Sequence, residues 1–265
     1  MKNKYFYLIV MVLFIFLNFK AAISKESREI KKTFKLNKEG RVMIDTYKGS
    51  ITVETWDQEK VSVRVKIEVD EWDSYAEEKV KNTEIVFRSS KNSLRIKTDY
   101  DKIKSHSSGL FSKNVGSLPL VHYSIKMPAT AELNIKDYKS DSKIMDLQAS
   151  LELETYKGTV IVEGLDGSID LETYKGDVEV EFKKFSGDSR FETYKGDIEL
   201  AIPENASLNV EAVISYKADF DSDFDLDVTY KGRKGRDRIY RGKINRGGWH
   251  LDIETEKGEI RLVKK

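Results

Sequence analysis

Apolar and polar residues alternate through most of the chain, most clearly at residues 171–182. There Leu-Glu-Thr-Tyr-Lys-Gly-Asp-Val-Glu-Val-Glu-Phe alternates on both sides of a Lys-Gly pair. Alternation with a period of two is typical of a β-strand with one buried face. We expect the glycines in equivalent places, Gly158, Gly176 and Gly196, to take the positive φ that a tight corner needs. The pattern therefore predicts a repeating unit of strand, corner and strand.

One tetrapeptide, Thr-Tyr-Lys-Gly, recurs in these units. Complete copies stand at 46–49, 155–158, 173–176, 193–196 and 229–232. Weaker copies begin at residues 137, 215 and 255. Tyrosines 138, 156, 174, 194 and 216 are spaced 18, 18, 20 and 22 residues apart, a period found in solenoid proteins. One unit buries only a few apolar side chains, such as Leu151, Leu153, Val160 and Val162. These cannot offset the entropy lost on ordering the unit, so the units must stack on each other.

Stacked units bring equivalent residues of neighbouring strands to about 4.8 Å from each other. The alternation predicts an external row of tyrosines: Tyr138, Tyr156, Tyr174, Tyr194 and Tyr216. A row of lysines would run beside it: Lys157, Lys175 and Lys195. A row of glutamates would supply the opposite charge: Glu154, Glu172 and Glu192. Two interpretations stay open, a ligand-binding stripe or a structural surface whose charges compensate each other.

The region before the repeats, residues 25–100, is predicted to be rich in β-strands and to carry one short helix. Strand patterns occur at 34–36, 42–44, 51–53, 61–67, 84–88 and 94–98. Residues 73–82 predict the helix, with Asp73 or Ser74 as N-cap. Residues 101–118, rich in Ser, Gly and Lys, predict a mobile loop. The repeats occupy residues 119–265, and we expect them to form one continuous domain with residues 25–100.

Residues 1–24 have the outline of a secretory signal peptide. Lys2 and Lys4 precede an apolar run, and we expect cleavage before Lys25. The run from Tyr5 to Phe19 has 15 residues, or about 22 Å as a helix, which is short for a hydrocarbon core of roughly 30 Å and favours cleavage over an uncleaved anchor. The segment therefore predicts an exported protein of the periplasm, the cell surface or the extracellular space, with no membrane span after cleavage.

Composition excludes several classes of function. The 46 Lys and Arg nearly balance the 45 Asp and Glu, whereas a nucleic-acid binder concentrates excess positive charge on one face. Cleavage of residues 1–24 would remove three lysines and no acid, leaving a slightly acidic protein. The chain has no cysteine and three histidines, so disulfides, thiolate metal sites and cysteine nucleophiles are excluded. We expect no catalytic residue, no cofactor and no metal site.

Aspartates alternate with other residues over 219–227, which would place five carboxylates on one face of a strand. A basic stretch follows at 231–246. The two segments could pair with each other, or the carboxylates could hold a cation. An EF-hand loop starting at Asp221 would need Gly and Glu where the chain has Leu226 and Gly232. Residues 249–262 predict a further strand, corner and strand unit, which we expect to be the final one.

With these features the chain resembles the bacterial DUF4097 family of β-strand repeat proteins, whose members are also described as candidate adhesins. The resemblance covers most of residues 30–265. It is carried by Met127-Pro128-Ala129 before the repeats, by successive T-x-x-G-[DST]-[IV] motifs, and by Glu256-Lys257-Gly258-Glu259-Ile260 at the close. It implies an all-β, right-handed β-solenoid (β-helix) with rungs of about 18–22 residues, located in the cell envelope or outside the cell. It carries over no catalytic residue and no role for the Tyr-Lys pairs, because family members commonly have small residues at that corner.

Three functions are compatible with the sequence. The first is a non-catalytic, adhesin-like envelope or surface protein that binds an unidentified protein or glycan, but no nucleic acid, along the tyrosine and lysine rows. The second is a purely structural or sensory envelope module. The third is a polysaccharide-active enzyme that would use two carboxylates of the segment 219–227. The oligomeric state stays open, because the end strands of a stack can pair with other chains.

Overall fold

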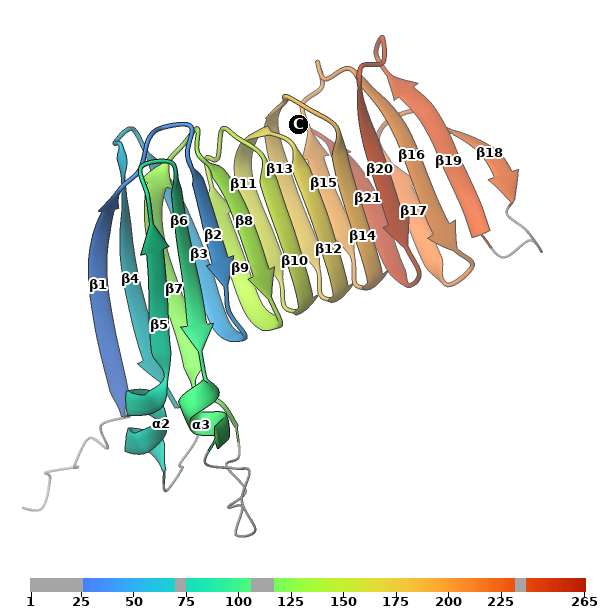
Figure 1. Ribbon diagram of the computed structural model, residues 1–265. Helices are drawn as coiled ribbons and strands as arrows, with labels where there is room; N and C mark the ends of the chain where they lie inside the picture. The colour runs from blue at the N-terminus through green and yellow to red at the C-terminus, as the bar shows by residue number, and fades with distance from the viewer. Residues whose placement is uncertain (1–25, 70–74, 106–116, 232–236) are drawn as a thin grey trace, which may run out of the picture.

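The computed structural model describes residues 26–69, 75–105, 117–231 and 237–265 (Figure 1). The described chain is almost entirely β-structure, and its strands form two long sheets. Between residues 120 and 222 successive strands alternate between these two sheets. The all-β prediction is confirmed. The predicted signal peptide, residues 1–24, lies outside the described residues.

In each sheet, every strand is hydrogen-bonded to the strands before and after it in the following orders. The ten-stranded sheet contains β1 (Ser27–Lys35), β4 (Lys60–Glu68), β7 (Leu120–Pro128), β3 (Lys48–Trp56), β9 (Lys139–Met145), β11 (Val160–Gly167), β13 (Val178–Phe185), β15 (Ile198–Ile202), β21 (Gly258–Lys264) and β17 (Ala218–Ser222). The eleven-stranded sheet contains β18 (Asp227–Lys231), β19 (Asp237–Ile244), β16 (Leu208–Ser215), β20 (Trp249–Thr255), β14 (Ser189–Lys195), β12 (Ile169–Lys175), β10 (Leu151–Lys157), β8 (Glu132–Asp137), β2 (Arg41–Asp45), β6 (Ser93–Asp99) and β5 (Glu84–Ser89).

The hydrophobic core lies between the two sheets, and the alternation decides which residues enter it. In β10, Leu151 and Leu153 are buried, whereas Glu152 and Glu154 are exposed. In β11, Val160 and Val162 are buried from the other sheet. Burial of each such side chain contributes about 1.5–3 kcal/mol. The prediction that these four residues point inward is confirmed.

The repeat units pair in parallel and in register. Leu153 lies opposite Leu171, and Thr155 lies opposite Thr173; the same alignment continues from β12 to β14. A shift by one residue would turn every side chain to the other face of the sheet, so a shared register places like residues in rows. The tetrapeptide copies of β10, β12 and β14 therefore lie side by side.

The last unit of the sequence is not the last in space, contrary to expectation. β20 lies between β14 and β16, and β21 lies between β15 and β17 (Figure 1). The corner residues give a physical reason. Gly258 has a φ of 123°, and a Cβ there would lie 2.1 Å from the carbonyl oxygen of Gly196. The copy at 215–218 has Ala218 in the equivalent place, so it cannot pack against Gly196 in that conformation.

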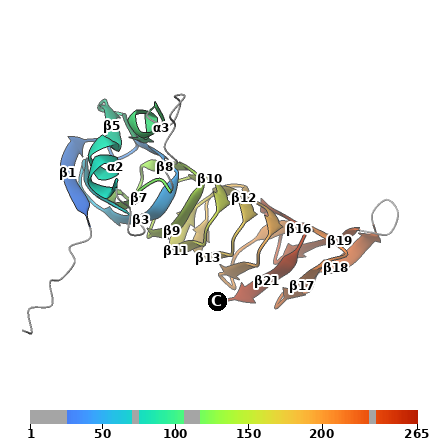
Figure 2. The same cartoon turned by 90° about the horizontal axis from the view of Figure 1, so that it is seen from below.

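The region before the repeats joins both sheets. β2 and β3 pair in parallel with β8 and β9, whereas β1, β4 and β7 form an antiparallel group at the edge of the ten-stranded sheet. The six strand patterns predicted between residues 34 and 98 all overlap β1 to β6. Two short helices, α2 (Ala76–Asn82) and α3 (Asp101–Ser105), lie at one end of these strands (Figures 1 and 2).

The two helices correct the prediction of a single one. α2 has Tyr75 as its N-cap, without a side-chain capping bond; the predicted N-caps, Asp73 and Ser74, lie outside the described residues. α3 occupies the start of the predicted loop 101–118, because Asp99 accepts a hydrogen bond from the Asp101 amide at 2.8 Å and Ile103 is buried. Residues 106–116 of that loop lie outside the described residues. Within the described ranges, no helix has the length and apolar character needed to cross a membrane.

Candidate functional site

A glycine at each corner fixes how closely the repeat units approach. Gly158, Gly176 and Gly196 have φ values of 151°, 159° and 149°, which confirms the predicted positive φ. A Cβ on Gly176 would lie 1.8 Å from the carbonyl oxygen of Gly158, and one on Gly196 would lie 1.9 Å from that of Gly176. Only glycine fits so close to a neighbouring backbone.

The aspartate after the corner glycine holds the next unit in place. Asp177 Oδ1 accepts a hydrogen bond from the Asp197 amide at 3.0 Å, and Asp197 Oδ1 accepts one from the Glu259 amide at 2.8 Å. Asp141 does the same for the Thr159 amide at 2.9 Å. A carboxylate that accepts from a backbone amide makes a charge-assisted bond. These bonds keep the corners, and the side chains beside them, in rows.

Five tyrosines form a continuous stack on the outer face of the eleven-stranded sheet: Tyr47, Tyr138, Tyr156, Tyr174 and Tyr194. Neighbouring ring centroids are 4.7–4.8 Å apart, and neighbouring planes differ by 2–7°. We call this set the tyrosine stack. The external row is therefore confirmed for four of its predicted members, and Tyr47 extends it by one.

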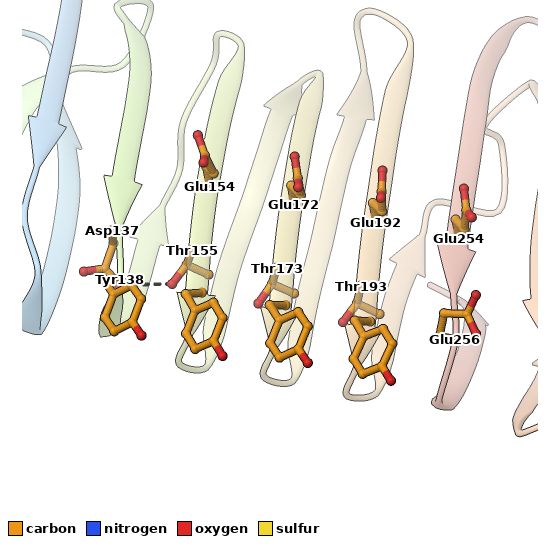
Figure 3. A pocket seen from close by; sticks show the side chains of 13 residues that line it. Asp137, Tyr138, Glu154, Thr155, Glu172, Thr173, Glu192, Thr193, Glu254 and Glu256 are labelled. Carbon is orange, nitrogen blue, oxygen red and sulfur yellow. Dashed lines mark hydrogen bonds between the residues drawn. The ribbon is translucent and has the colours of Figure 1, made fainter.

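Tyr216, the fifth predicted member, does not belong to the tyrosine stack. β20 lies between β14 and β16, and its Thr255 pairs with Thr193, so Glu256 follows where a tyrosine would continue the row (Figure 3). The ring of Tyr216 is 62% exposed and has the Lys217 ammonium 5.3 Å from its centroid. The strand inserted between the two units separates them.

Both ends of the tyrosine stack are covered. Lys257 Nζ lies 4.8 Å from the ring centroid of Tyr194 and donates a hydrogen bond to its hydroxyl at 3.2 Å. At the other end the ring of Tyr100 meets that of Tyr47 edge-on, with centroids 6.3 Å apart. Every ring face inside the stack is covered by a neighbouring tyrosine. The stack therefore offers ring edges and hydroxyl groups, and no ring face onto which a sugar could stack.

Four glutamates lie beside the tyrosine stack on the same outer face: Glu154, Glu172, Glu192 and Glu254 (Figure 3). We call this set the glutamate column. Lys136 Nζ pairs with Glu154 at 2.8 Å, and this hydrogen bond raises the pKa of Lys136. Arg190 pairs with Glu192. Within the described residues, no Lys or Arg forms an ion pair with Glu172 within 4 Å.

The predicted lysine row exists but does not compensate the glutamates. Lys157 lies opposite Lys175, and Lys175 lies opposite Lys195. None of the three forms an ion pair with another described residue. They stand at the corners, three residues further along each strand than the glutamates, whereas Lys136 lies directly opposite Glu154 on β8. The compensating cations are therefore Lys136 and Arg190.

Buried threonines lie beneath these rows. Thr155 Oγ1 donates a hydrogen bond to Asp137 Oδ2 at 3.0 Å. Ser140 donates to the same carboxylate from its amide at 2.6 Å and from its hydroxyl at 2.7 Å. Burial raises the pKa of Asp137 in spite of these bonds. The buried hydroxyl groups of Thr173 and Thr193 have no hydrogen-bond partner within the described part of the chain.

The tyrosine stack from Tyr138 onward, the glutamate column and the buried threonines line a shallow groove of about 570 Å³ over β8, β10, β12, β14 and β20 (Figure 3). We call it the Tyr–Glu groove. It presents carboxylates and tyrosine hydroxyls at the spacing of neighbouring strands. Such a surface can attract cations and accept hydrogen bonds. Over the described residues, no group of three or more His, Cys, Asp or Glu side chains is arranged to hold a metal ion.

One further member of the tyrosine stack, Tyr47, and one of the glutamate column, Glu254, could have been found in the sequence. Tyr47 belongs to a complete Thr-Tyr-Lys-Gly copy, and Glu254 precedes the weaker copy at 255–258. Both residues are far in the sequence from residues 138–194, and the pairing of distant strands is decided by the fold as a whole. The repeat period therefore did not predict their place beside the other members.

The predicted acidic strand over 219–227 is broken. β17 ends at Ser222, whose hydroxyl donates a hydrogen bond to the Phe224 carbonyl and accepts one from the Phe224 amide, both at 3.0 Å. Side-chain bonding to the nearby backbone competes with strand pairing and turns the chain. The five aspartates are therefore not aligned on one strand.

Pairing between the acidic and basic segments is limited in the described side chains. Arg238 lies 4.0 Å from the Asp219 carboxylate. Asp223 instead accepts a hydrogen bond from the Lys264 amide at 2.9 Å. Residues 232–236 of the basic stretch lie outside the described residues.

Comparison with known proteins gives one family and several distant structures. The family described as Toastrack DUF4097 matches residues 73–263. A candidate cell adhesion protein from Clostridium sporogenes is 14% identical, with 91% of this chain and 100% of that chain covered and a TM-score of 0.46. A candidate adhesin from Bacteroides fragilis is 11% identical, with coverages of 90% and 97% and a TM-score of 0.36. A candidate lipid binding protein from Parabacteroides distasonis is 12% identical, with coverages of 91% and 98% and a TM-score of 0.30. No curated protein matches the chain.

Proposed function

This chain belongs to the Toastrack DUF4097 family, and from that premise we propose that it is an exported, non-catalytic, adhesin-like protein of the cell envelope or surface. Its fold in this proposal is a right-handed β-solenoid. The alternation of strands between two sheets supports the solenoid. The strong preference of parallel crossover connections for the right hand supports its handedness.

The Tyr–Glu groove is the surface that binds in this proposal, and its single supporting observation is the glutamate column beside the tyrosine stack. A linear partner lying across the strands meets a carboxylate on each strand in turn, about 4.8 Å apart. Lys136 pairs with Glu154 and Arg190 pairs with Glu192, whereas Glu172 forms no ion pair with any described Lys or Arg, so the groove keeps a negative charge at Glu172. Charge complementarity then selects a cationic partner.

The chemistry of the tyrosine stack favours a polypeptide over a glycan in this groove. A sugar bound by stacking needs an open ring face, and the faces within the stack are covered by other tyrosines. Ring edges and hydroxyls suit the side chains and backbone of an extended peptide instead. The partner is therefore a protein segment rich in Lys or Arg.

The test uses the purified protein and a decalysine peptide, with decaglutamate as the opposite-charge control. Titration calorimetry at low salt should show decalysine binding that weakens as salt is added. Glu172→Gln with Glu192→Gln should weaken it about tenfold or more. The matched control is Glu179→Gln with Glu199→Gln, since these paired glutamates lie on the other sheet. Equal affinities of the two double variants, or no binding at all, would contradict the proposal.

The tyrosines are tested separately. Tyr156, Tyr174 and Tyr194 replaced together by Ser should abolish decalysine binding, whereas Tyr216→Ser should leave it unchanged. Thermal unfolding of each variant shows whether the fold is retained. Unchanged affinity of a folded triple variant would remove the tyrosine stack from the binding surface and leave the glutamate column as the part that binds.

A second candidate function is a purely structural or sensory envelope module. It is favoured by the covered ends of the tyrosine stack, because a stack that satisfies itself needs no ligand. Under this alternative the tyrosine variants lose stability and no peptide binds. A polysaccharide-active enzyme is the least favoured, since the aspartates of 219–227 do not share one strand. Incubation with acidic and neutral glycans without product formation would exclude it.

A further inference from the structure

A second hollow lies at the opposite end of the strands from the tyrosine stack. Trp249 is the first residue of β20, whereas Thr255, beside the stack, is the last. The hollow has a volume of about 720 Å³ and is lined by the end of β13, the loop between β15 and β16, and the start of β20. We call it the Trp249 pocket. Its lining includes Lys183, Lys184, Phe185, Pro203 and Asn205.

The aromatic ring of this pocket is open to a ligand. Trp249 is 49% exposed, and within the described chain no aromatic ring or lysine ammonium lies against it. Its indole N–H has no protein acceptor there either. Phe185 is buried beside it and provides an apolar floor. The tyrosine stack is covered by its own members, whereas Trp249 offers a flat apolar surface with a hydrogen-bond donor at its edge.

The walls of the pocket are fixed by hydrogen bonds. Asn245 Nδ2 donates to the carbonyl oxygens of Glu204 at 3.0 Å and Ala206 at 2.6 Å. Asn209 Nδ2 donates to the carbonyl oxygen of Gly248 at 2.7 Å. These bonds hold the loop between β15 and β16 and the backbone just before Trp249. A site whose walls are already ordered loses less entropy when a ligand binds.

The charge at the mouth of the pocket is positive. Lys183 and Lys184 are both exposed, and neither forms an ion pair with another described residue. Arg246 lines an adjoining hollow that shares Pro203, Asn205 and Ser207 with the pocket. Glu204 is the acidic residue of that hollow, and its single charge does not cancel the three cations. An anionic group is therefore favoured beside Trp249.

We propose that the Trp249 pocket binds an acidic saccharide, one sugar ring stacking on Trp249 while its carboxylate pairs with Lys183 and Lys184. A concave site with an aromatic wall and a few polar groups is the usual form of a small-ligand site, and this volume is in the usual range. The apolar ring face suits the C–H face of a sugar, and Asn205 suits its hydroxyls. This site is separate from the Tyr–Glu groove and has the opposite charge.

The experiment titrates the purified protein with tetragalacturonate and with its fully methyl-esterified form, which keeps the sugar and removes the charge. Calorimetry and tryptophan fluorescence follow binding. Tetragalacturonate should bind at least about tenfold more tightly than the ester. Trp249→Ala, and Lys183→Ser with Lys184→Ser, should each weaken binding about tenfold or more. Trp249→Ala should also lose the fluorescence change, since Trp249 lines the pocket.

Controls separate this site from the rest of the molecule. Tyr216→Ser removes another exposed aromatic residue, and Lys157→Ser with Lys175→Ser removes two other unpaired cations; both should bind like the unchanged protein. The lysine variant tests the site independently if Trp249→Ala fails to fold. The proposal is overturned if tetragalacturonate does not bind, if the ester binds equally well, or if hexaglutamate binds more tightly than tetragalacturonate. This test does not depend on peptide binding in the Tyr–Glu groove, because the two sites share no lining residue. Glu172→Gln with Glu192→Gln should therefore leave tetragalacturonate binding unchanged.

Discussion

The ring of Tyr174 lies 4.8 Å from the ring of Tyr194, and their planes differ by 2°. Tyr156 covers its other face at the same distance. A stacked pair contributes about 0.5–1.5 kcal/mol, so Tyr174→Ala, which removes two pairs, should lower the free energy of unfolding by about 1–3 kcal/mol. Tyr216→Ala, outside the stack, should change it by less than about 0.5 kcal/mol. Urea unfolding compares the two; equal losses would contradict a stabilising role for the stack.

Gly176→Ala should be far more damaging than an ordinary surface substitution. Its Cβ would lie 1.8 Å from the Gly158 carbonyl oxygen, at a φ of 159°. The neighbouring strands would have to separate, and we expect a loss of about 3 kcal/mol or more. Gly187→Ala is the matched control, because the nearest atom to its Cβ is the Ser168 Cβ at 3.1 Å. Thermal unfolding distinguishes them, and a mild effect at Gly176 would show that the corner can widen.

The buried carboxyl of Asp137 should make stability depend on pH. Burial raises its pKa above the ordinary value of 3.8, so the folded protein holds this proton more tightly than the unfolded chain does. Its contribution is fully present below the unfolded-state pKa and is lost as pH rises through the folded-state pKa. The free energy of unfolding of the unchanged protein, minus that of Asp137→Asn, should therefore fall as pH rises. Urea unfolding at about pH 3, 5 and 7 measures this difference; a rise with pH would refute the assignment.

Deletion of residues 249–265 should disrupt more than one end of the molecule. It removes β20 and β21, which separate β14 from β16 and β15 from β17. β16 and β17 would then lose their parallel partners, and β16, β18 and β19 would be left paired only with one another. We expect proteolysis to remove residues 208–248 from the shortened protein while residues 119–202 stay protected. Protection of both segments would show that β16 can pair directly with β14.

Much of the fold follows from local pattern. The inward positions of Leu151 and Leu153 and the corner at Gly176 depend on residues within a few positions of each other, and these predictions are confirmed. The place of β20 depends on a contact between Gly258 and Gly196, which are 62 residues apart. Pairing at that distance is chosen by the packing of the whole molecule, and periodicity alone does not reveal it.

The candidate sites were less predictable than the strands. Ion pairs depend on which side chains face each other across two strands, as Lys136 and Glu154 do, and the recurring tetrapeptide does not include Lys136. The Trp249 pocket depends on the loop between β15 and β16, whose path is set by Asn245. A single tryptophan after two glycines was the available signal in the sequence, and it is equally compatible with an ordinary strand.

The insertion of β20 and β21 also bears on how the chain reaches its native state. A ribosome delivers β16 and β17 before β20 and β21, yet the later strands lie between the earlier ones and the rest of the stack. β16 can first pair antiparallel with β19, in a unit separate from the rest of the stack. The stack thus cannot grow one rung at a time to its end, and its far end closes only after β20 and β21 have been synthesised. Such late, long-range pairing is intrinsically slow, so this end of the protein is where folding finishes.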